Sequence, residues 1–252
     1  MTKNGNVWKI TVDTHRYVAD STIVENALNS MQKMKIKNII TKNPDKLAKY
    51  ELENGKSKRV QVFSKSKKLA DVMVGKFKFD PQTRMASSYV RLSGKNEVYS
   101  TDGFSGINIS DNINTYRVKT ITDFDPASLR GIKLNKGGVE KEILKQGNDW
   151  VFGNTVLDSA KITAYISSLS RIKGSKFLEL DEIKNRSNPD QLILQLNDDT
   201  IQIEAYPDTI SSKGFVIHSS ANDEAYFESD SLGIYRNIFG KIGDIIKQME
   251  IK

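Results

Sequence analysis

The sequence predicts an α+β protein built as two tandem repeats, each a mainly antiparallel β-meander with one amphipathic helix packed on the sheet. Three observations predict this class. Short stretches that alternate apolar and polar residues, typical of half-buried strands, recur along the chain. Two other segments carry apolar residues at helical spacing. Residues 150–180 repeat the order of strand, capped helix and strand found in residues 8–40.

The first elements follow from local patterns. Residues 7–12 alternate and are rich in β-branched side chains, which predicts a strand. Asp20 or Ser21 then caps a helix, because either side chain can accept a hydrogen bond from the first helical N–H groups. Its apolar residues at helical spacing are Ile23, Val24, Ala27, Leu28, Met31 and Met34. A strand around residues 36–40 and one helical turn at 46–50 are expected next.

From residue 51 the pattern changes to short strands separated by turns. The expected strands are 59–63, 69–75, 88–92 and 97–100. Their connections are too short for parallel crossovers, so an antiparallel meander is expected. Residues 104–128 show few periodic signals and are expected to connect the two halves.

The second half begins with a hairpin over residues 129–144 and continues to a strand at Trp150. A helix is expected after Asp158 and Ser159, followed by further strands. The later elements are strands at 191–196, 200–204, 214–218 and 225–228 and a helix within 232–249.

The helical segments of the two halves align without gaps, residues 20–40 with residues 158–178. This alignment divides the chain into repeats 1–118 and 119–252. Only seven residues precede Trp8, whereas a hairpin precedes the second tryptophan, so the first repeat is expected to be N-terminally truncated.

Composition excludes several classes of protein. The chain has 252 residues, 38% of them hydrophobic, and no cysteine, which excludes disulfides, thiolate metal sites and a cysteine nucleophile. No apolar run reaches the ~18 to 20 residues of a membrane span, and the start has no apolar core of a signal peptide. If the natural protein is anchored, we expect the anchor to be missing from this sequence.

The net charge of +7 is concentrated at the N-terminal end. Residues 1–68 hold 15 Lys or Arg against 6 Asp or Glu, whereas the remaining residues hold 23 against 25. Such a field attracts nucleic acid, anionic lipid or acidic protein, although a solvated lysine-rich surface is the simpler interpretation. The candidate polyanion patch comprises Lys56, Lys58, Arg59, Lys65, Lys67 and Lys68. Phe63 alone lies near it in sequence, and this scarcity of stacking aromatics disfavours nucleic acid.

Two motifs carry a family resemblance. One is the G-N-x-W strand followed by a helix that opens on Asp-Ser. The other is Y-V-R-x-x-G-x-x-x-V-Y, which runs from Tyr89 to Tyr99. Together with the link from Tyr116 to Leu134, they resemble the DUF4340 family over about residues 5–230.

This resemblance implies a bacterial domain of unknown function with no defined catalytic residues. Members typically carry one N-terminal membrane helix, hold the domain outside the cytoplasm, and are often encoded beside ABC-2-type transporters. These include gliding-associated components in Bacteroidetes.

The residues themselves predict no enzyme. The two histidines, His15 and His218, lie in no catalytic motif, and no phosphate-binding loop, nucleophile elbow or calcium loop is present. No catalytic residue, metal site or cofactor is therefore expected. Trp8 and Trp150 could form ligand platforms, but core packing is the favoured interpretation.

These observations favour a non-enzymatic, extracytoplasmic accessory or binding domain of a bacterial envelope or ABC-type transport system. Its expected partner is a protein, with transporter subunits as candidates, and its only membrane contact would be the missing anchor. The alternative is a polyanion-binding module that uses the basic N-terminal third for envelope polysaccharide, anionic lipid or nucleic acid.

Overall fold

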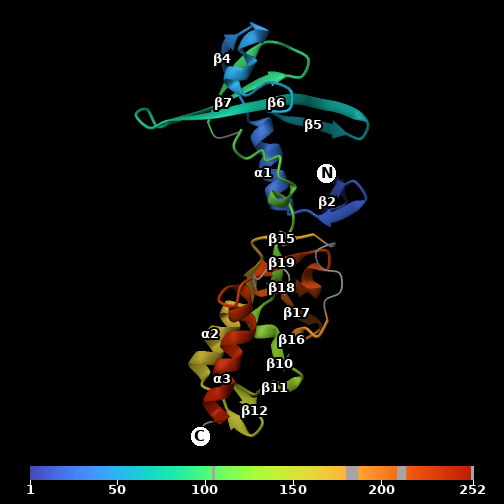
Figure 1. The fold of residues 1–252 in the computed structure, drawn as a ribbon, viewed down its shortest axis with the longest axis vertical. Coiled ribbons are helices and arrows are strands. Elements are labelled where there is room, and N and C mark those ends of the chain that lie inside the picture. Colours follow the sequence, from blue (N-terminus) through green and yellow to red (C-terminus); the bar gives the residue numbers. More distant parts are fainter. Residues whose placement is uncertain (104–105, 180–186, 209–213, 251–252) are drawn as a thin grey trace. The chain divides into compact units, whose positions relative to one another are not determined.

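The protein consists of two compact units, Met1–Arg117 and Val118–Lys252, each with its own sheets and core (Figure 1). The computed structural model describes residues 1–103, 106–179, 187–208 and 214–250. The division lies next to the boundary at residue 118 expected from the sequence.

Unit 1 begins with a three-stranded antiparallel sheet and a helix. These elements are β1 (Thr2–Asn4), β2 (Val7–Val12), β3 (His15–Val18) and α1 (Ser21–Gln32). Asp20 is the cap of α1, because its Oδ1 accepts from the N–H groups of Thr22 and Ile23 at 3.0 and 3.3 Å. The apolar stripe of α1 and the inner side of β2 and β3 share a small core. Its buried members are Ile10, Tyr17, Ala19, Val24 and Tyr116.

The rest of unit 1 is a five-stranded antiparallel sheet. Its strands are β4 (Ile36–Thr41), β5 (Lys58–Ser64), β6 (Lys67–Asp80), β7 (Met85–Leu92) and β8 (Val98–Asp102), in the order β4-β8-β7-β6-β5. A 3-10 helix, η1 (Pro44–Tyr50), connects β4 with β5, and another, η2 (Ile113–Thr115), precedes the end of the unit. Two separate buried clusters, one around Leu52 and one around Val74, pack against this sheet. Strands β4 and β5 form its edges.

Unit 2 is built on a nine-stranded antiparallel sheet in the order β13-β12-β11-β10-β16-β17-β18-β19-β15. These strands are β10 (Leu129–Lys136), β11 (Val139–Gln146), β12 (Asp149–Phe152), β13 (Thr155–Val156), β15 (Phe177–Leu178), β16 (Asp190–Leu196), β17 (Thr200–Asp208), β18 (Gly214–Ser219) and β19 (Tyr226–Ser229). Strands β9 (Thr120–Asp123) and β14 (Arg171–Lys173) form a separate pair, and the 3-10 helices among the described residues of this unit are η3 (Pro126–Ser128) and η5 (Ser220–Asn222).

Helices cover one face of this sheet. Helix α2 (Ser159–Leu169) contacts α3 (Lys241–Glu250), which continues from a π-helical turn, η6 (Arg236–Gly240) (Figure 1). Alternate residues of the strands, such as Ile132, Leu194 and Ile203, are fully buried in a large core shared with the helices. The Tyr165 hydroxyl donates to the Ile238 carbonyl at 2.7 Å and so connects α2 to η6.

The predicted fold class is wrong. The protein is 48% strand and 23% helical, with large antiparallel sheets, and its units are not two copies of a meander with one helix each. In unit 1 the Trp8 strand belongs to a small sheet of its own, whereas in unit 2 the Trp150 strand is part of the nine-stranded sheet. Unit 2 also has the additional helix α3. Alternation in a sequence predicts which side chains face a core, but it does not predict which strands pair.

Shared local structure explains why the sequences around Trp8 and Trp150 are similar. The Trp8 carbonyl accepts from the Ala19 N–H at 2.9 Å, and the Trp150 carbonyl accepts from the Leu157 N–H at 2.8 Å. In addition, β16-β17-β18-β19-β15 are neighbours in the same order as β5-β6-β7-β8-β4. The two orders differ at one end, since β10 covers the outer edge of β16 whereas β5 has no further neighbour in its sheet within the described part of the chain.

Candidate functional site

The candidate site is a groove in unit 1 with a volume of about 780 Å³. This volume falls in the range of protein pockets that bury most of a bound ligand. Apolar side chains predominate in the lining, with a few basic and polar groups. The lining residues come from β1, β2, α1, β5 and the segment around Ile109. They are Met1, Thr2, Lys3, Trp8, Val24, Ala27, Leu28, Met31, Arg59, Val60, Gln61, Val62, Phe63, Lys65, Ile109, Ser110 and Tyr116.

The groove follows the open edge of β5. Five consecutive residues, 59–63, line it. Successive side chains of a strand point to opposite faces of the sheet. Burial follows this alternation, with Val60 and Val62 half-buried and Arg59 and Gln61 exposed. Because both sets line one groove, we infer that the groove reaches the strand edge. Backbone groups at an edge are unpaired by the sheet and can accept an additional strand.

Helix α1 forms the opposite wall. Val24, Ala27, Leu28 and Met31 line the groove and follow the i, i+3, i+4, i+7 spacing of one helical face. Val24 is buried, whereas the other three are only half-buried. The stripe that the sequence predicts therefore serves two purposes. Its Val24 end completes the small core, and the remaining residues leave apolar surface along the groove.

Trp8 lies at the junction of these walls. The residue is half-buried and packs against the small core of unit 1, while it also lines the groove. Its indole Nε1 is buried without a hydrogen-bond partner among the described residues. The Lys3 ammonium lies 5.6 Å from the ring centroid, which is a cation–π arrangement. Trp8 therefore packs on the small core, which was the favoured interpretation of the sequence, and also lines the groove.

The six residues of the candidate polyanion patch all lie in or next to the β5–β6 hairpin, but they do not form one free cluster. Arg59 Nε and Nη2 donate to the two carboxylate oxygens of Asp71 at 2.9 Å each, and Lys68 Nζ donates to Asp71 Oδ2 at 2.9 Å. Lys56 pairs with Glu53 at 3.3 Å.

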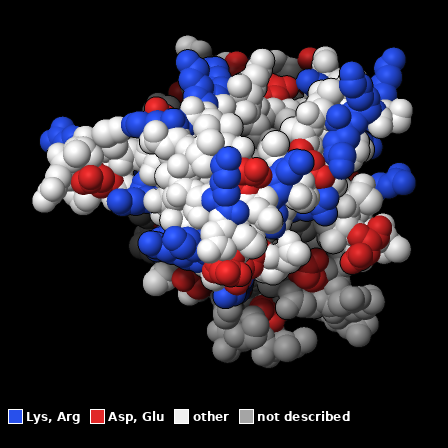
Figure 2. All heavy atoms as spheres, turned by 90° about the horizontal axis from the view of Figure 1, so that it is seen from above, with Lys and Arg blue, Asp and Glu red and all other residues white. Residues whose placement is uncertain are grey.

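The other lysines of the patch differ in their surroundings. Lys58 Nζ donates to the Ile109 carbonyl at 2.9 Å. Lys65 and Lys67 make no ion pair within the described part of the chain, and of these two only Lys65 lines the groove. On the face shown in Figure 2, Lys and Arg side chains are likewise interspersed with Asp and Glu.

Asp71 is the acidic centre of this hairpin. Hydrogen bonds from Arg59, from Gln61 and from Lys68 hold the pKa of its carboxyl well below the usual range. The carboxylate is thus charged at any physiological pH, and it neutralises part of the positive charge that the sequence places here. This role of Asp71 was not predicted from the sequence, because Asp71 pairs across the hairpin with residues as far as twelve positions away.

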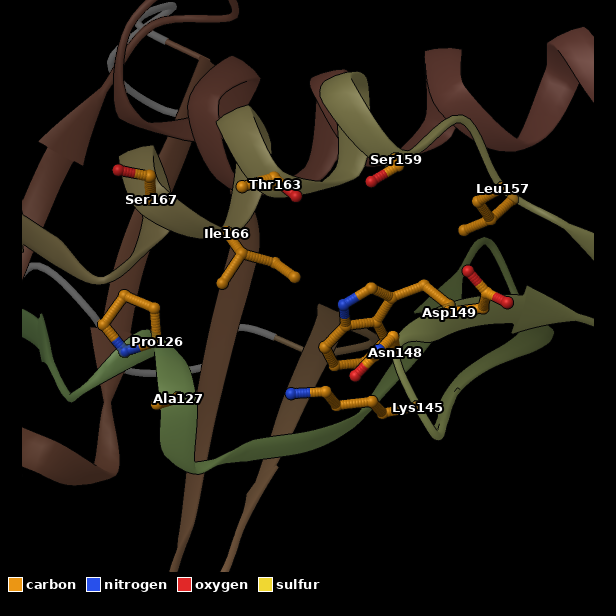
Figure 3. A pocket seen from close by; sticks show the side chains of 11 residues that line it. Pro126, Ala127, Lys145, Asn148, Asp149, Leu157, Ser159, Thr163, Ile166 and Ser167 are labelled. Atoms are coloured by element: carbon orange, nitrogen blue, oxygen red, sulfur yellow. The ribbon is translucent and has the colours of Figure 1, made fainter.

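A second pocket, of about 410 Å³, lies in unit 2 beside Trp150 (Figure 3). Helix α2 contributes Ser159, Thr163 and Ser167, and Lys145 and Asp149 lie on the opposite side (Figure 3). Trp150 itself belongs to the main core of unit 2, as the favoured interpretation of the sequence expected. Ile166 is the one apolar side chain that α2 adds to the described lining, and it is buried, whereas the three hydroxyl-bearing residues are exposed, so the α2 side of this pocket is more polar than the α1 wall of the unit 1 groove.

A polar network lies on β16, β17 and β18 in unit 2. Glu204 accepts from Gln191 and Gln202 at 3.2 and 3.0 Å and from the Tyr206 hydroxyl at 2.6 Å. His218 Nδ1 lies 3.5 Å from Glu204 Oε2. Every polar atom of the carboxylate is thus already engaged within the protein. We interpret this network as a cross-strand structural feature.

The pKa values in the network follow from these contacts. Burial raises the pKa of Glu204, but the hydrogen bonds from Tyr206, Gln191 and Gln202 outweigh it and bring the net pKa below the usual value. Burial and the hydrogen bond to Glu204 raise the pKa of Tyr206. The carboxylate is therefore charged and the phenol neutral near pH 7.

The two histidines of the sequence belong to different units. His15, in β3, stacks on Tyr17 with centroids 6.3 Å apart, and His218 stacks on Tyr226 at 4.5 Å. Among the residues that the structure describes, no three His, Asp or Glu side chains come together as they would to hold a metal ion.

Comparison with models of protein families assigns the chain to a family. The model of the family described as a domain of unknown function, DUF4340, matches residues 8–195. The chain belongs to the DUF4340 family. The match includes most of the groove lining and extends into β16. Searches of curated proteins and of solved structures gave no match.

Two further observations concern this DUF4340 chain. Within the described residues, no helix has the length and apolar character needed to cross a membrane. Arg59 and Lys65 belong to the polyanion patch expected from the sequence, and Trp8 is one of its two candidate ligand platforms, but the sequence does not predict the groove that these residues share. Their common location depends on β5 being an edge strand, and pairing partners of strands are not encoded in local alternation.

Proposed function

We propose that this DUF4340 chain is a non-enzymatic binding domain that acts outside the cytoplasm, as an accessory component of an ABC-type transport system of the bacterial envelope. It binds another protein through the unit 1 groove. One observation carries the proposal, namely an apolar groove that runs along an open strand edge. Open edges and apolar grooves are surfaces that polypeptide partners recognise.

The electrostatics favour a protein over a polyanion as the occupant. Arg59 and Lys68 are already paired with Asp71, and Lys56 with Glu53. A polyanion would have to compete with these carboxylates for most of its contacts, whereas a protein segment can bind largely through apolar and main-chain contacts. The polyanion-binding alternative rests on Lys65 and Lys67, and it is tested separately in the Discussion.

The location can be tested with an introduced cysteine. These 252 residues contain no cysteine, so Asn154→Cys, at an exposed turn, gives this domain a single thiol, and the unsubstituted full-length protein serves as the labelling control. In spheroplasts of the native bacterium, a membrane-impermeant maleimide should label the full-length variant without lysis. Labelling that requires lysis would place the domain in the cytoplasm and refute this part of the proposal.

The contact surface can be tested by photocrosslinking in the same cells. A benzoylphenylalanine at Val62, in the groove, should crosslink to a transporter subunit. The same residue at Lys95, which is exposed between β7 and β8, serves as the matched control. Equal crosslinking from both positions, or none from Val62, would contradict binding through the groove.

A further inference from the structure

We infer that the unit 1 groove binds an extended segment of the partner polypeptide, which adds to the sheet as a strand beside β5. The segment alternates apolar residues with acidic ones. This inference rests on the proposed function, because it names the form and chemistry of the partner at the same site. It goes further in predicting strand addition and charge, neither of which a general binding surface would require.

A comparison of the two large sheets supports strand addition at β5. In unit 2, β16 lies at the start of the order β16-β17-β18-β19-β15, and β10 pairs antiparallel with its outer edge from Leu129↔Leu196 to Asn135↔Gln191. In unit 1, β5 lies at the start of the corresponding order, and among the residues that the structure describes no strand pairs with its outer edge. The position that β10 fills in unit 2 is thus open in unit 1.

The backbone groups at the edge of β5 favour an extended ligand. An unpaired edge presents N–H and C=O groups at the spacing of a strand, and a helical ligand cannot satisfy them because its own backbone groups are already paired. Only an extended segment can form a ladder with β5. Main-chain hydrogen bonds of this kind supply affinity, and side-chain pockets supply specificity.

The apolar wall that α1 forms favours apolar side chains on the added strand. Alternate side chains of an added strand would face Ala27, Leu28 and Met31 of α1, which are half-buried. In unit 2 the corresponding residues of β10 are apolar, since Ile132 and Leu134 are buried there. The partner segment should accordingly have apolar residues at every second position.

The positive charge of the β5–β6 hairpin favours an acidic partner segment over a second copy of this chain. Residues 58–80 of the β5–β6 hairpin hold seven Lys or Arg and two Asp, a balance of +5. Pairing β5 with β5 of a second copy would place two such hairpins side by side, and like charges oppose this. Lys65 lies in the groove without an ion pair among the described residues, so acidic side chains on the segment complete the charge match.

The test selects peptides from a phage-displayed library of random twelve-residue sequences against the purified chain. Enriched sequences should alternate apolar and acidic residues and contain no central proline. Enrichment of basic or helix-patterned sequences, or no enrichment at all, would overturn the inference.

Variants locate the binding of the enriched peptides. Ala27→Trp narrows the groove and should weaken binding at least tenfold, whereas Asn26→Trp, on the exposed side of α1, should leave it unchanged. Lys65→Glu should weaken binding severalfold, and Lys95→Glu should not. Equal effects within either pair would contradict the assigned site. Thermal unfolding of each variant verifies that it is folded.

Hydrogen exchange of the unmodified protein gives a readout that needs no variant. A bound peptide should slow exchange at alternate amides of β5 and of the peptide itself, since only outward N–H groups join the new ladder. Protection confined to unit 2, or a helical peptide, would overturn strand addition. A dimer protected at β5 without peptide would assign the edge to a second copy instead.

The outcomes also separate this inference from the proposed function. Peptide binding at β5 together with cytoplasmic labelling of Asn154→Cys would refute the location and retain the strand-addition site. Envelope crosslinks from Val62 together with no strand ladder would retain the binding function and refute this mode of binding.

Discussion

Arg59 and Asp71 form a two-point ion pair across the β5–β6 hairpin, in which guanidinium Nε and Nη2 each donate to a different carboxylate oxygen at 2.9 Å. Two parallel hydrogen bonds fix the planar guanidinium against the carboxylate. Arg59 is therefore held as part of the hairpin, although its position in the sequence suggests a free cation. This relationship separates the two functional hypotheses, because Asp71 repels the polyanions that the surrounding lysines attract.

The polyanion hypothesis is tested by Asp71→Asn. Removing the carboxylate frees Arg59 and Lys68, so affinity for heparin or single-stranded DNA should rise severalfold. Its logarithmic salt dependence should become steeper by about one to two units, since each additional phosphate contact adds roughly 0.7 to 0.9. Binding is measured by fluorescence titration from 50 to 300 mM salt, with Asp102→Asn as a control at another exposed ion pair. Tight, steeply salt-dependent binding by the unmodified chain would favour the polyanion module instead.

Acid should destabilise unit 2 partly through Glu204. Its folded pKa is lower than the unfolded value of about 4.3, so its contribution to the free energy of unfolding is present above that pH. This contribution is lost as the pH falls through the folded pKa. Glu204→Gln should therefore have a shallower loss of unfolding free energy between pH 5 and 3 than the unmodified chain, measured by urea denaturation. An unchanged slope would contradict the assigned network.

Trp8 should tolerate removal of its N–H better than removal of its ring. The indole Nε1 is buried without a partner among the described residues, which costs about 1 to 3 kcal/mol. Trp8→Phe removes this donor along with some apolar area, so we expect a loss of less than about 1 kcal/mol. Trp8→Ala loses the packing of the whole ring and should cost about 3 kcal/mol. Chemical denaturation measures both, and similar losses would show that the N–H is satisfied in solution.

Two glycines of unit 2 should respond in opposite ways to substitution by alanine. A Cβ at Gly174 would lie 2.0 Å from the ring of Phe227, which is fully buried, so Gly174→Ala should cost at least about 2 kcal/mol. Gly243 lies in α3 and an added Cβ there would meet nothing within 4 Å. Gly243→Ala should stabilise by roughly 0.5 to 1 kcal/mol through helix propensity. Differential scanning calorimetry on both variants checks the pair, and a neutral Gly174→Ala would contradict the packing against Phe227.

Much of the local structure was predictable from the sequence. The strand at residues 7–12 has the predicted bounds, Asp20 caps its helix, and the strands of the meander lie where alternation placed them. Local hydrogen bonds and side-chain periodicity determine such elements. Strand β9 was missed within residues 104–128, because it contains a single apolar residue, Ile121, and one residue defines no period.

The arrangement of these elements was not predictable in the same way. Sequence similarity around the two tryptophans suggested two copies of one fold, yet the strands that contain them belong to sheets of different sizes. The similarity reflects a shared local structure, namely a strand joined to a capped helix. It does not extend to the partners of these strands, since distant residues determine the pairing.

The sequence by itself determined the position of most strands and helices, the basic N-terminal third and the membership of the DUF4340 family. Only the tertiary structure decided that β5 is an open edge facing α1, that Trp8 lines this groove, and that Asp71 neutralises part of the basic hairpin. The physical reason is the sequence separation over which each interaction acts. Periodicity and capping act within a few residues, whereas an open edge and a cross-strand ion pair depend on which distant strands pair.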